Sequence, residues 1–200
     1  LNESAELAAQ RMAAHLICPS PRPGTKPAAR EELWRFSISG DLPLMTVLLR
    51  DERHAALARQ AVRAHAYLTR LGLRFDLALV NLQSEGYFQP LRDALLSLLA
   101  SCSSRDTIGR PGGVTLVDAG LYPPHAVEAL LSLSALELDG NGGSAARQLA
   151  LMESRWPAPE TLGRRLSALR PAHGTPALDN GYGGFLSDGG YLCYRQPPAA

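Results

Sequence analysis

The sequence predicts an α/β fold, a three-layer segment with a short, mainly parallel sheet of three or four strands flanked by helices. Short apolar runs of strand type alternate with stretches of helical period between residues 44 and 152. This alternation is typical of parallel sheets built from right-handed crossovers. An N-terminal helix precedes the sheet, and a stretch rich in glycine and aromatic residues after it predicts a truncated C-terminal β-hairpin.

Composition excludes several classes of function. The 200 residues are 46% apolar, and 20 basic against 19 acidic side chains give a net charge of +1. We therefore expect no nucleic-acid partner. The apolar runs fall well short of the ~20 residues that cross a bilayer, so we expect no direct membrane insertion by this segment. The three cysteines lack metal-ligand spacing, and we expect no metal and no cofactor.

The first part of the chain, residues 1–32, is predicted to be an N-terminal helix and a proline-rich linker. Residues 3–16 are rich in helix-forming Ala, Leu, Glu, Gln and Arg, and closely spaced prolines follow from Pro19 to Pro23. The sequence starts without Met, a basic segment or an apolar leader. We therefore expect the chain to be a fragment of a longer protein.

The α/β domain is predicted for residues 33–152. Its strands are expected at 44–49, 73–81 and 114–117, with a short fourth strand at 136–138. The helices between them are expected to expose charged faces and to bury one apolar stripe each. Their apolar positions are Leu57, Ala61, Ala64, Leu68 and Leu71, then Leu91, Leu95, Leu98 and Leu99, then Val127, Leu130, Leu131 and Ser134. A last helix is expected over 144–152.

The C-terminal part is predicted to be a linker over 153–178 and the truncated start of a β-sandwich domain over 179–200. Residues 179–194 alternate glycines with aromatics around an Asp-Gly turn. Because a lone hairpin is marginal in water, we expect it to belong to an antiparallel domain that the chain does not contain.

Polar side chains follow the expected strands, at the edge where open parallel sheets bind ligands. Asp51 follows strand one, Asn81 and Glu85 follow strand two, and Asp118 follows strand three. The same residue types also cap helices and satisfy backbone groups, so a structural role stays open beside a binding role. One alternative function is therefore a free-standing enzyme that binds a sugar nucleotide, with Asp51, Glu85 and Asp118 as its carboxylates.

No catalytic residue can be assigned from motifs. Residues 140–145 (GNGGSA) match the loose dinucleotide-binding pattern, but they follow the last strand of the sheet, which favours a plain glycine-rich turn. The five histidines show no metal-ligand spacing and no nucleophile elbow, so we expect them at the surface or in packing.

Several segments carry a family resemblance. Residues 33–43 (LWRFSISGDLP) resemble a segment of the cyclic β-1,2-glucan synthase family that reads Leu-Trp-Arg, an aromatic or His, and Gly-Ile-Ser-Gly-Asp-Leu-Pro. The resemblance covers roughly residues 1 to 195 and continues through residues 63–67 (RAHAY), 76–81 (DLALVN), 111–114 (PGGV) and 138–140 (LDG). Residues 180–185 (NGYGGF) and 188–189 look like the family's entry into its phosphorylase-like region. This chain departs from that pattern at Ser37, at Asp179 and at 188–191.

The resemblance implies a large membrane enzyme of the cytoplasmic face of a bacterial inner membrane. Such an enzyme builds β-1,2-glucan from UDP-glucose upstream and trims it by phosphorolysis in a glycoside hydrolase family 94-like region downstream. This chain would be the join, a non-catalytic linker that contacts the flanking domains of the same polypeptide, with β-glucan as a further candidate partner. The resemblance implies that residues 40–43 shape the turn into strand one, and as an alternative it would bring Trp34 and Asp41 to a sugar. A third hypothesis is a carbohydrate-binding module that uses the terminal hairpin.

Overall fold

The computed structural model describes residues 3–19, 28–83, 89–101, 109–155, 183–186 and 191–193. Its contacts group the chain into two units, residues 1–155 and 156–200. Each unit is described by itself below. The finer division at 32/33, 152/153 and 178/179 stays a prediction.

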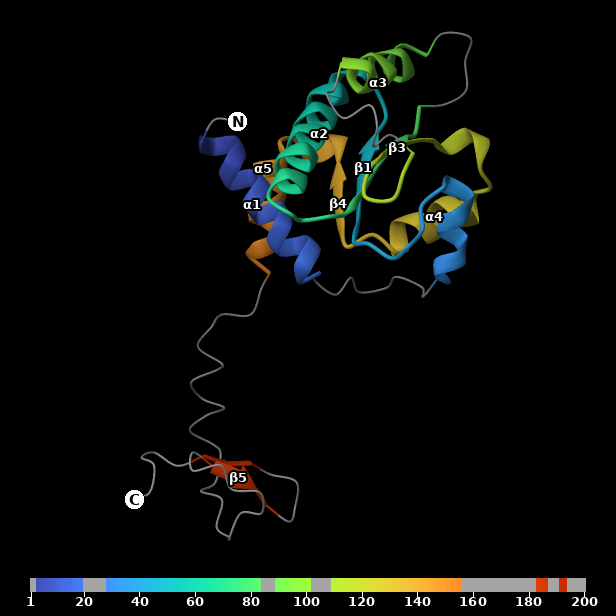
Figure 1. Ribbon diagram of the computed structural model, residues 1–200. Helices are drawn as coiled ribbons and strands as arrows, with labels where there is room; N and C mark the ends of the chain where they lie inside the picture. The colour runs from blue at the N-terminus through green and yellow to red at the C-terminus, as the bar shows by residue number, and fades with distance from the viewer. Residues whose placement is uncertain are drawn as a thin grey trace. The chain divides into compact units, whose positions relative to one another are not determined.

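The first unit is built on a parallel sheet, as the sequence predicts. Its strands are β1 (Leu44–Leu49), β2 (Asp76–Asn81), β3 (Val114–Asp118) and β4 (Leu136–Asp139), and they lie in the order β3-β2-β1-β4. All three pairings are parallel. Every residue of β1 and β2 is buried, because helices or turns cover both faces of the two central strands. The predicted α/β fold is confirmed (Figure 1).

Four helices contribute to the core on one face of the sheet. They are α1 (Glu3–Ile17), α2 (Ala55–Arg70), α3 (Pro90–Ser101) and α5 (Ala145–Glu153). Leu57, Ala61, Ala64 and Leu68 of α2 lie in this core, as the period predicts. Leu71, which the period also predicts on this stripe, is 65% exposed because the helix ends at Arg70 and the chain turns at Gly72, with φ at +94°. Helix α1 packs on α2 and α5 and shares this core, so the N-terminal helix belongs to the layer that covers the sheet.

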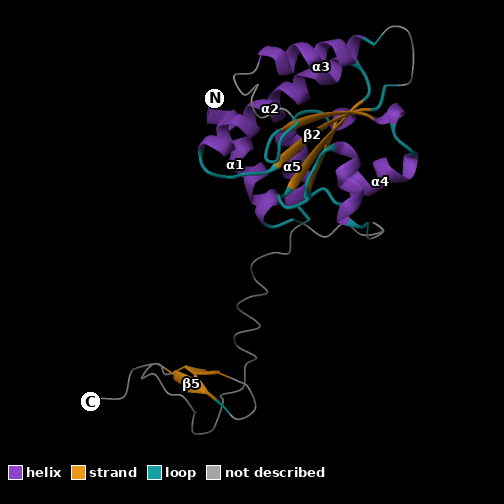
Figure 2. Cartoon of the chain, turned by 45° about the vertical axis from the view of Figure 1, so that its right-hand side comes forward, coloured by secondary structure: helices purple, strands orange, loops and turns teal. Residues whose placement is uncertain are grey.

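The second face is covered by α4 (Pro124–Ser132) and the 3₁₀ helix η1 (Arg30–Phe36), which pack together (Figure 2). Pro124 occupies the first turn of α4, where a missing N–H is tolerated. The predicted buried stripe of α4 is right only in part. The helix buries Ala126, Ala129 and Leu130, while Val127 and Leu131 are partly exposed. Phe36 and Tyr122 pack in the same cluster, with their ring centroids 4.5 Å apart.

Backbone bonds join three of the resemblance segments at the amino-terminal edge of the sheet. The Asp76 amide donates to the carbonyl of Pro43 at 2.9 Å, and the Leu77 amide donates to the carbonyl of Gly113 at 2.9 Å. The Asp76 carboxylate accepts the amide of Gly112 at 2.6 Å. Gly112 has a φ of +78°, which a side chain would strain. These segments therefore connect β1, β2 and the entry into β3.

The buried carboxyl of Asp76 allows the packing of this edge to be tested through the pH dependence of stability. Burial raises the pKa of its carboxyl above the ordinary value, although the Gly112 and Gly113 amides and nearby Arg74 oppose the shift. A raised pKa means that the folded chain holds this proton more tightly than the unfolded chain, so stability falls as pH rises from about 4 through the folded pKa. We expect Asp76→Asn to gain stability relative to the native chain between pH 4 and pH 7.

Urea unfolding across this pH range measures the difference in unfolding free energy between Asp76→Asn and the native chain. Asp93→Asn, which removes an exposed carboxylate from α3, is the matched control. A difference for Asp76→Asn that stays constant with pH would contradict this account of the edge.

The second unit contains an antiparallel pair, β5 (Gly183–Phe185) and β6 (Tyr191–Cys193). Phe185 pairs with Tyr191 and Gly183 with Cys193. The predicted hairpin is present in these strands, while the Asp-Gly turn lies outside the described residues. Among the helices that the structure describes, none has both the length and the apolar character to span a bilayer.

Candidate functional site

The carboxyl ends of the four parallel strands meet at one edge of the sheet. Asp51, Asn81 and Asp118 lie at or just after the ends of β1, β2 and β3, as the sequence predicts. The structure adds Asp139 at the end of β4, next to β1. Glu85 lies outside the described residues. The interactions at this edge form two clusters, one at β2 and β3 and the other at β1 and β4.

The first cluster centres on Asp118. Its Oδ1 accepts a hydrogen bond from Asn81 Nδ2 at 2.9 Å, and its Oδ2 accepts one from Arg92 Nε of α3 at 3.0 Å. The Oδ1 of Asn81 in turn accepts the Gln83 amide at 3.0 Å. A pocket of about 240 Å³ lies against this cluster. Asn81 and Asp118 are therefore brought together, and the carboxylate already has a partner on each oxygen.

The second cluster centres on Asp139. Its Oδ1 accepts a hydrogen bond from Arg50 Nη1 at 2.6 Å and another from the Asn141 amide at 2.8 Å. Burial raises the pKa of this carboxyl, but the hydrogen bonds from Arg50 and the Asn141 amide outweigh burial and hold the pKa below its ordinary value. Asp139 is thus an ionised partner of Arg50, and the pair ties β4 to the loop after β1.

Asp51 belongs to the second cluster rather than the first. Its side chain accepts the Arg53 amide at 2.9 Å and pairs with the Arg53 guanidinium at 2.8 Å. Hydrogen bonding to the Arg53 side chain is the main cause that lowers the pKa of Asp51. The carboxylate therefore caps the turn at residues 52–54, which is the structural role left open by the sequence.

The glycine-rich loop after β4 closes against neighbouring side chains. A Cβ at Gly140 would overlap the imidazole of His54, which is buried and accepts the Arg50 amide at 3.0 Å. A Cβ at Gly142 would lie 2.6 Å from the amide carbon of Gln148. The same Gln148 side chain bonds both the amide and the carbonyl of Asp139, each at 2.8 Å. His54 and Gln148 thus pack directly against these glycines, as expected for a tight turn.

Trp34 and Asp41 lie away from the strand ends. Trp34 is 65% exposed and donates its indole N–H to the carbonyl of Ser39 at 3.3 Å. The Asp41 amide donates to the Ser39 hydroxyl at 3.3 Å. Asp41 lines a pocket of about 430 Å³ at the entry to β1, and Trp34 is not among the described residues that line it. The structure therefore places both residues around the turn that leads into β1.

Three histidines of the described residues pack inside the fold. His15, His54 and His65 are buried, and His65 Nε2 lies 3.1 Å from the carbonyl of Phe75. Burial lowers the pKa of His15 and His65, so these rings are neutral near pH 7. His125 is exposed. In the part of the chain that the structure describes, no group of three or more His, Cys, Asp or Glu residues is placed to hold a metal ion.

The sequence already places Arg50 beside Asp51 at the end of strand one, but it does not predict Arg92 and Asp139 as members of these clusters. Asp139 could have been found, because it follows a strand in the same way as Asp118 does. Arg92 carries no such signal, since it is one of many arginines and only the docking of α3 brings it to β3. Arg50 and Arg92 matter for the chemistry of this edge because they pair with Asp139 and Asp118. A catalytic role would need these carboxylates to be free.

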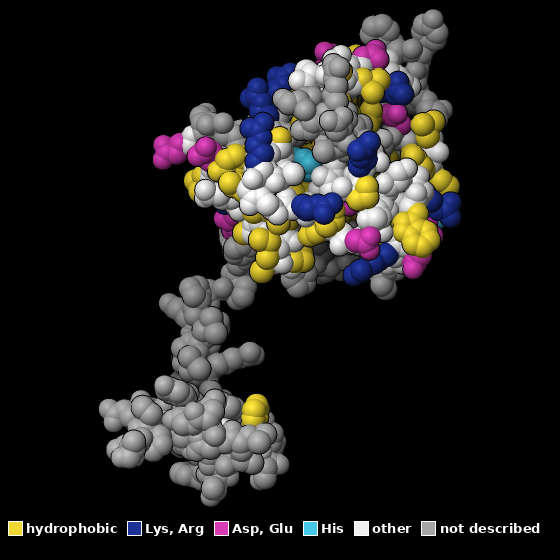
Figure 3. Space-filling model, in the orientation of Figure 1, with side chains coloured by type: hydrophobic (Ala, Val, Ile, Leu, Met, Phe, Trp, Pro, Cys, Tyr) yellow, Lys and Arg dark blue, Asp and Glu magenta, His cyan; other side chains and the backbone are white. Residues whose placement is uncertain are grey.

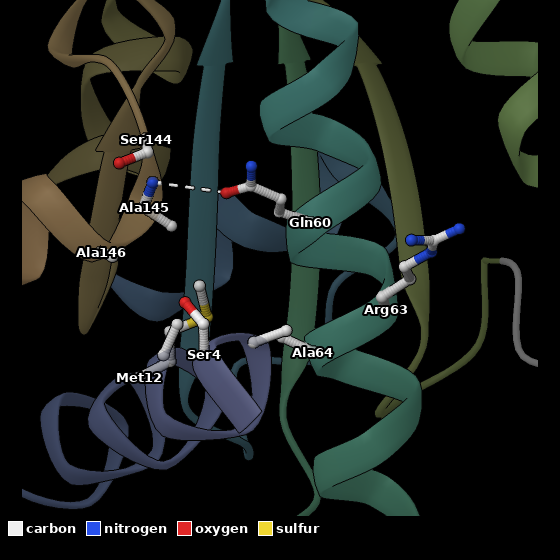
Figure 4. Close-up of a pocket in the computed structure, with 10 residues that line it drawn as sticks. Ser4, Met12, Gln60, Arg63, Ala64, Ser144, Ala145 and Ala146 are labelled. Atoms are coloured by element: carbon white, nitrogen blue, oxygen red, sulfur yellow. Dashed lines mark hydrogen bonds between the residues drawn. The ribbon is translucent and has the colours of Figure 1, made fainter. Parts of the chain in front are cut away.

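Another pocket, of about 680 Å³, lies between α1, α2 and α5. Figure 4 shows Gln60 of α2 reaching toward the amide of Ala145 at the start of α5, at 3.5 Å, with Met12 of α1 and Ala64 of α2 lower in the groove. The face of the molecule in Figure 3 intersperses basic, acidic and apolar side chains. None of the described residues that the sequence predicts as a site lines the pocket between α1, α2 and α5.

The fold is a parallel α/β unit. The carboxylates that the structure describes at its strand ends are bound to other groups of the same chain. No protein-family model matches the chain. A curated relative is the cyclic β-(1,2)-glucan synthase NdvB of Rhizobium meliloti (strain 1021), with 28% identity over 190 residues. The similarity covers 88% of this chain and 7% of the synthase, so the chain is similar to one small region of that enzyme.

Proposed function

We propose that this chain is a non-catalytic scaffold segment of a carbohydrate-active enzyme that synthesises and trims β-1,2-glucan. In this proposal glucosyl transfer from UDP-glucose and phosphorolysis take place in other parts of the polypeptide. The α/β unit connects those parts, and its partners are the flanking domains. The similarity to a region of a cyclic β-(1,2)-glucan synthase supports the glucan assignment.

The observation that carries the non-catalytic role is the state of the strand-end carboxylates. Asp118 is held by Asn81 and Arg92, Asp139 by Arg50, and Asp51 by Arg53. A general acid or base must reach the proton that it transfers and needs a pKa near the working pH. The pKa values of Asp51 and Asp139 are instead lowered. Both carboxylates are therefore suited to holding loops.

The proposed function also implies where in the cell the segment lies. We propose that the segment lies on the cytoplasmic face of a bacterial inner membrane, as part of a larger membrane protein. The support is the similarity to a region of the synthase. Labelling of a cysteine introduced at exposed Arg59, in intact and in permeabilised cells, tests this location.

A free-standing enzyme that binds a sugar nucleotide at the strand ends is the second candidate. The pocket beside Asp118 has a volume of about 240 Å³, which is below the roughly 300–1,000 Å³ typical of sites for larger ligands. A nucleoside diphosphate sugar also carries two phosphates, and the carboxylate of Asp118 would repel them. The size and the charge of this pocket therefore both favour the scaffold role.

Calorimetric titration with UDP-glucose separates the two candidates. We expect the chain to give no saturable heat, because the pocket beside Asp118 is small for a whole sugar nucleotide and the carboxylate repels the two phosphates. Asp118→Ala is the matched variant, and we expect its titration to look the same as that of the native chain. Saturable binding that Asp118→Ala abolishes would favour the sugar-nucleotide enzyme and overturn the scaffold role.

A carbohydrate-binding module that uses the terminal hairpin is the third candidate. The described part of the hairpin is limited to the strand pair β5 and β6, in which Phe185 is 54% exposed. An exposed aromatic ring can stack on the C–H face of a sugar. Affinity electrophoresis in a gel containing β-1,2-glucan, with Phe185→Ala as the variant, shows whether the hairpin retards the chain.

A further inference from the structure

We propose that the pocket beside Asp118 binds a single, uncharged glucosyl unit of a β-1,2-glucan chain and so gives the scaffold a contact with the polymer. The identity of the sugar rests on the proposed function. The binding of a neutral sugar rests on the pocket itself. Asn81, Gln83, Gln89, Arg92, Gly120 and Leu121 line it together with Asp118.

Neighbouring elements of the α/β unit build the pocket. It lies at the carboxyl ends of the adjacent strands β2 and β3 and at the start of α3. Its volume of about 240 Å³ exceeds the roughly 30 Å³ that one water takes in the liquid by several times, and it is smaller than sites for larger ligands. A single sugar ring is a ligand of the intermediate size that this space admits.

Arg92 is oriented before any ligand arrives. Its Nε donates to Asp118 Oδ2 at 3.0 Å, and Asp118 is itself fixed by Asn81. The Arg92 side chain is 41% exposed, and no described residue accepts from its two Nη groups. A guanidinium that is held through Nε presents its remaining donors in a fixed plane, which lowers the entropy lost when a ligand binds.

The charge of the lining selects a neutral ligand. The positive charge of Arg92 is offset by Asp118, and the other polar groups are the amide side chains of Asn81, Gln83 and Gln89. Amide side chains offer both donors and acceptors. Hydroxyl groups do the same, whereas a phosphate or carboxylate offers only acceptors and would meet the Asp118 charge. The lining therefore matches the hydroxyl groups of a sugar.

An apolar surface completes the complementarity. Leu121, in the turn after β3, lines the pocket and is 76% exposed. An exposed leucine beside a cluster of hydrogen-bonding groups can cover the C–H face of a sugar ring, while the polar groups bind its hydroxyls. A substitution at Leu121 should leave the fold intact because so little of this side chain is buried.

Saturation-transfer NMR of the whole chain tests the proposal with sophorose, the β-1,2-linked glucose disaccharide. We expect weak, saturable binding of sophorose and no signal transfer to UDP-glucose. Arg92→Ala should weaken sophorose binding about tenfold or more, because hydrogen bonds from a charged donor are lost. Arg92→Lys should behave in the same way, since a lysine that pairs with Asp118 has no planar fork left for the ligand.

Two further variants complete the design. Leu121→Glu should weaken sophorose binding without changing the backbone spectrum, which keeps the test decisive should an Arg92 variant fold poorly. Arg59→Ala is the matched control, because Arg59 is an exposed arginine of α2 that does not line the pocket. This control should bind sophorose as the native chain does.

The outcomes separate this site from the scaffold role. No transfer to sophorose, or transfer that survives Leu121→Glu and both Arg92 variants, would overturn the glucosyl site and leave the scaffold role standing. Transfer to UDP-glucose that depends on Asp118 would overturn the scaffold role. Equal binding of an unrelated disaccharide, such as maltose, would overturn the assignment to β-1,2-linked glucan.

Discussion

Gly140→Ala is expected to destabilise the chain by about 1–3 kcal/mol, the usual range for overfilling a packed site. The added Cβ would overlap the His54 imidazole. The ring cannot simply rotate away, because it is buried and accepts the amide of Arg50 at 3.0 Å. Urea unfolding followed by far-UV circular dichroism measures the loss as a lower transition midpoint.

The control for Gly140→Ala removes the His54 imidazole that the added methyl group would meet. In a His54→Ala background the new methyl group has room, so Gly140→Ala should then lose much less stability than in the native chain. The coupling between the two substitutions reports the steric contact directly. Equal losses in both backgrounds would show that His54 does not confine this loop.

Gln148→Leu is expected to have a somewhat larger effect, from lost hydrogen bonds rather than from a clash. The Gln148 amide accepts from the Asp139 amide at 2.8 Å and donates to the carbonyls of Asp139 and Gly143 at 2.8 and 3.0 Å. Leucine leaves all three backbone groups without this partner, at about 1–3 kcal/mol for each group cut off from water. We expect a total loss of about 2–4 kcal/mol, because solvent reaches part of this loop.

Arg147→Leu is the matched control for this substitution. Arg147 is the preceding residue of α5 and its side chain is exposed, so the same replacement should change the unfolding free energy by less than about 0.5 kcal/mol. Similar losses for the two variants, measured by urea unfolding, would contradict the role assigned to the Gln148 amide.

The contacts of His54 and Gln148 with the glycines explain why the sequence of this stretch allows two interpretations. The pattern of residues 140–145 fits a dinucleotide loop as well as a tight turn, since both need glycine where backbone and side chain approach closely. The side chains that decide between them, His54 and Gln148, lie outside the motif in the sequence. Only the docking of the loop after β1 and of α5 brings them to the glycines.

The parallel sheet, in contrast, was predictable from local pattern. The strand expected at 44–49 is β1 without change, because a continuous apolar run is the property of a strand buried on both faces. The second strand starts at Asp76 rather than at residue 73, since Leu73 still belongs to the turn that closes α2. The place of β4 beside β1 is a tertiary feature that no local period reports.

The candidate site was predictable only in its location. The rule for parallel sheets correctly gathers Asp51, Asn81 and Asp118 at one edge. The rule says nothing about charge pairing, because Arg92 lies 26 residues before Asp118 and Arg50 lies 89 residues before Asp139. These long-range pairs turn a row of carboxylates that could look catalytic into a set of structural contacts.

Turnover tests the central claim, a non-catalytic scaffold, most directly. The chain is incubated with UDP-glucose to detect UDP release, and with β-1,2-glucan and phosphate to detect glucose 1-phosphate. The account predicts neither product above the level of a protein-free control, for the native chain and for Asp118→Asn alike. Formation of either product by the native chain, lost in Asp118→Asn, would contradict it.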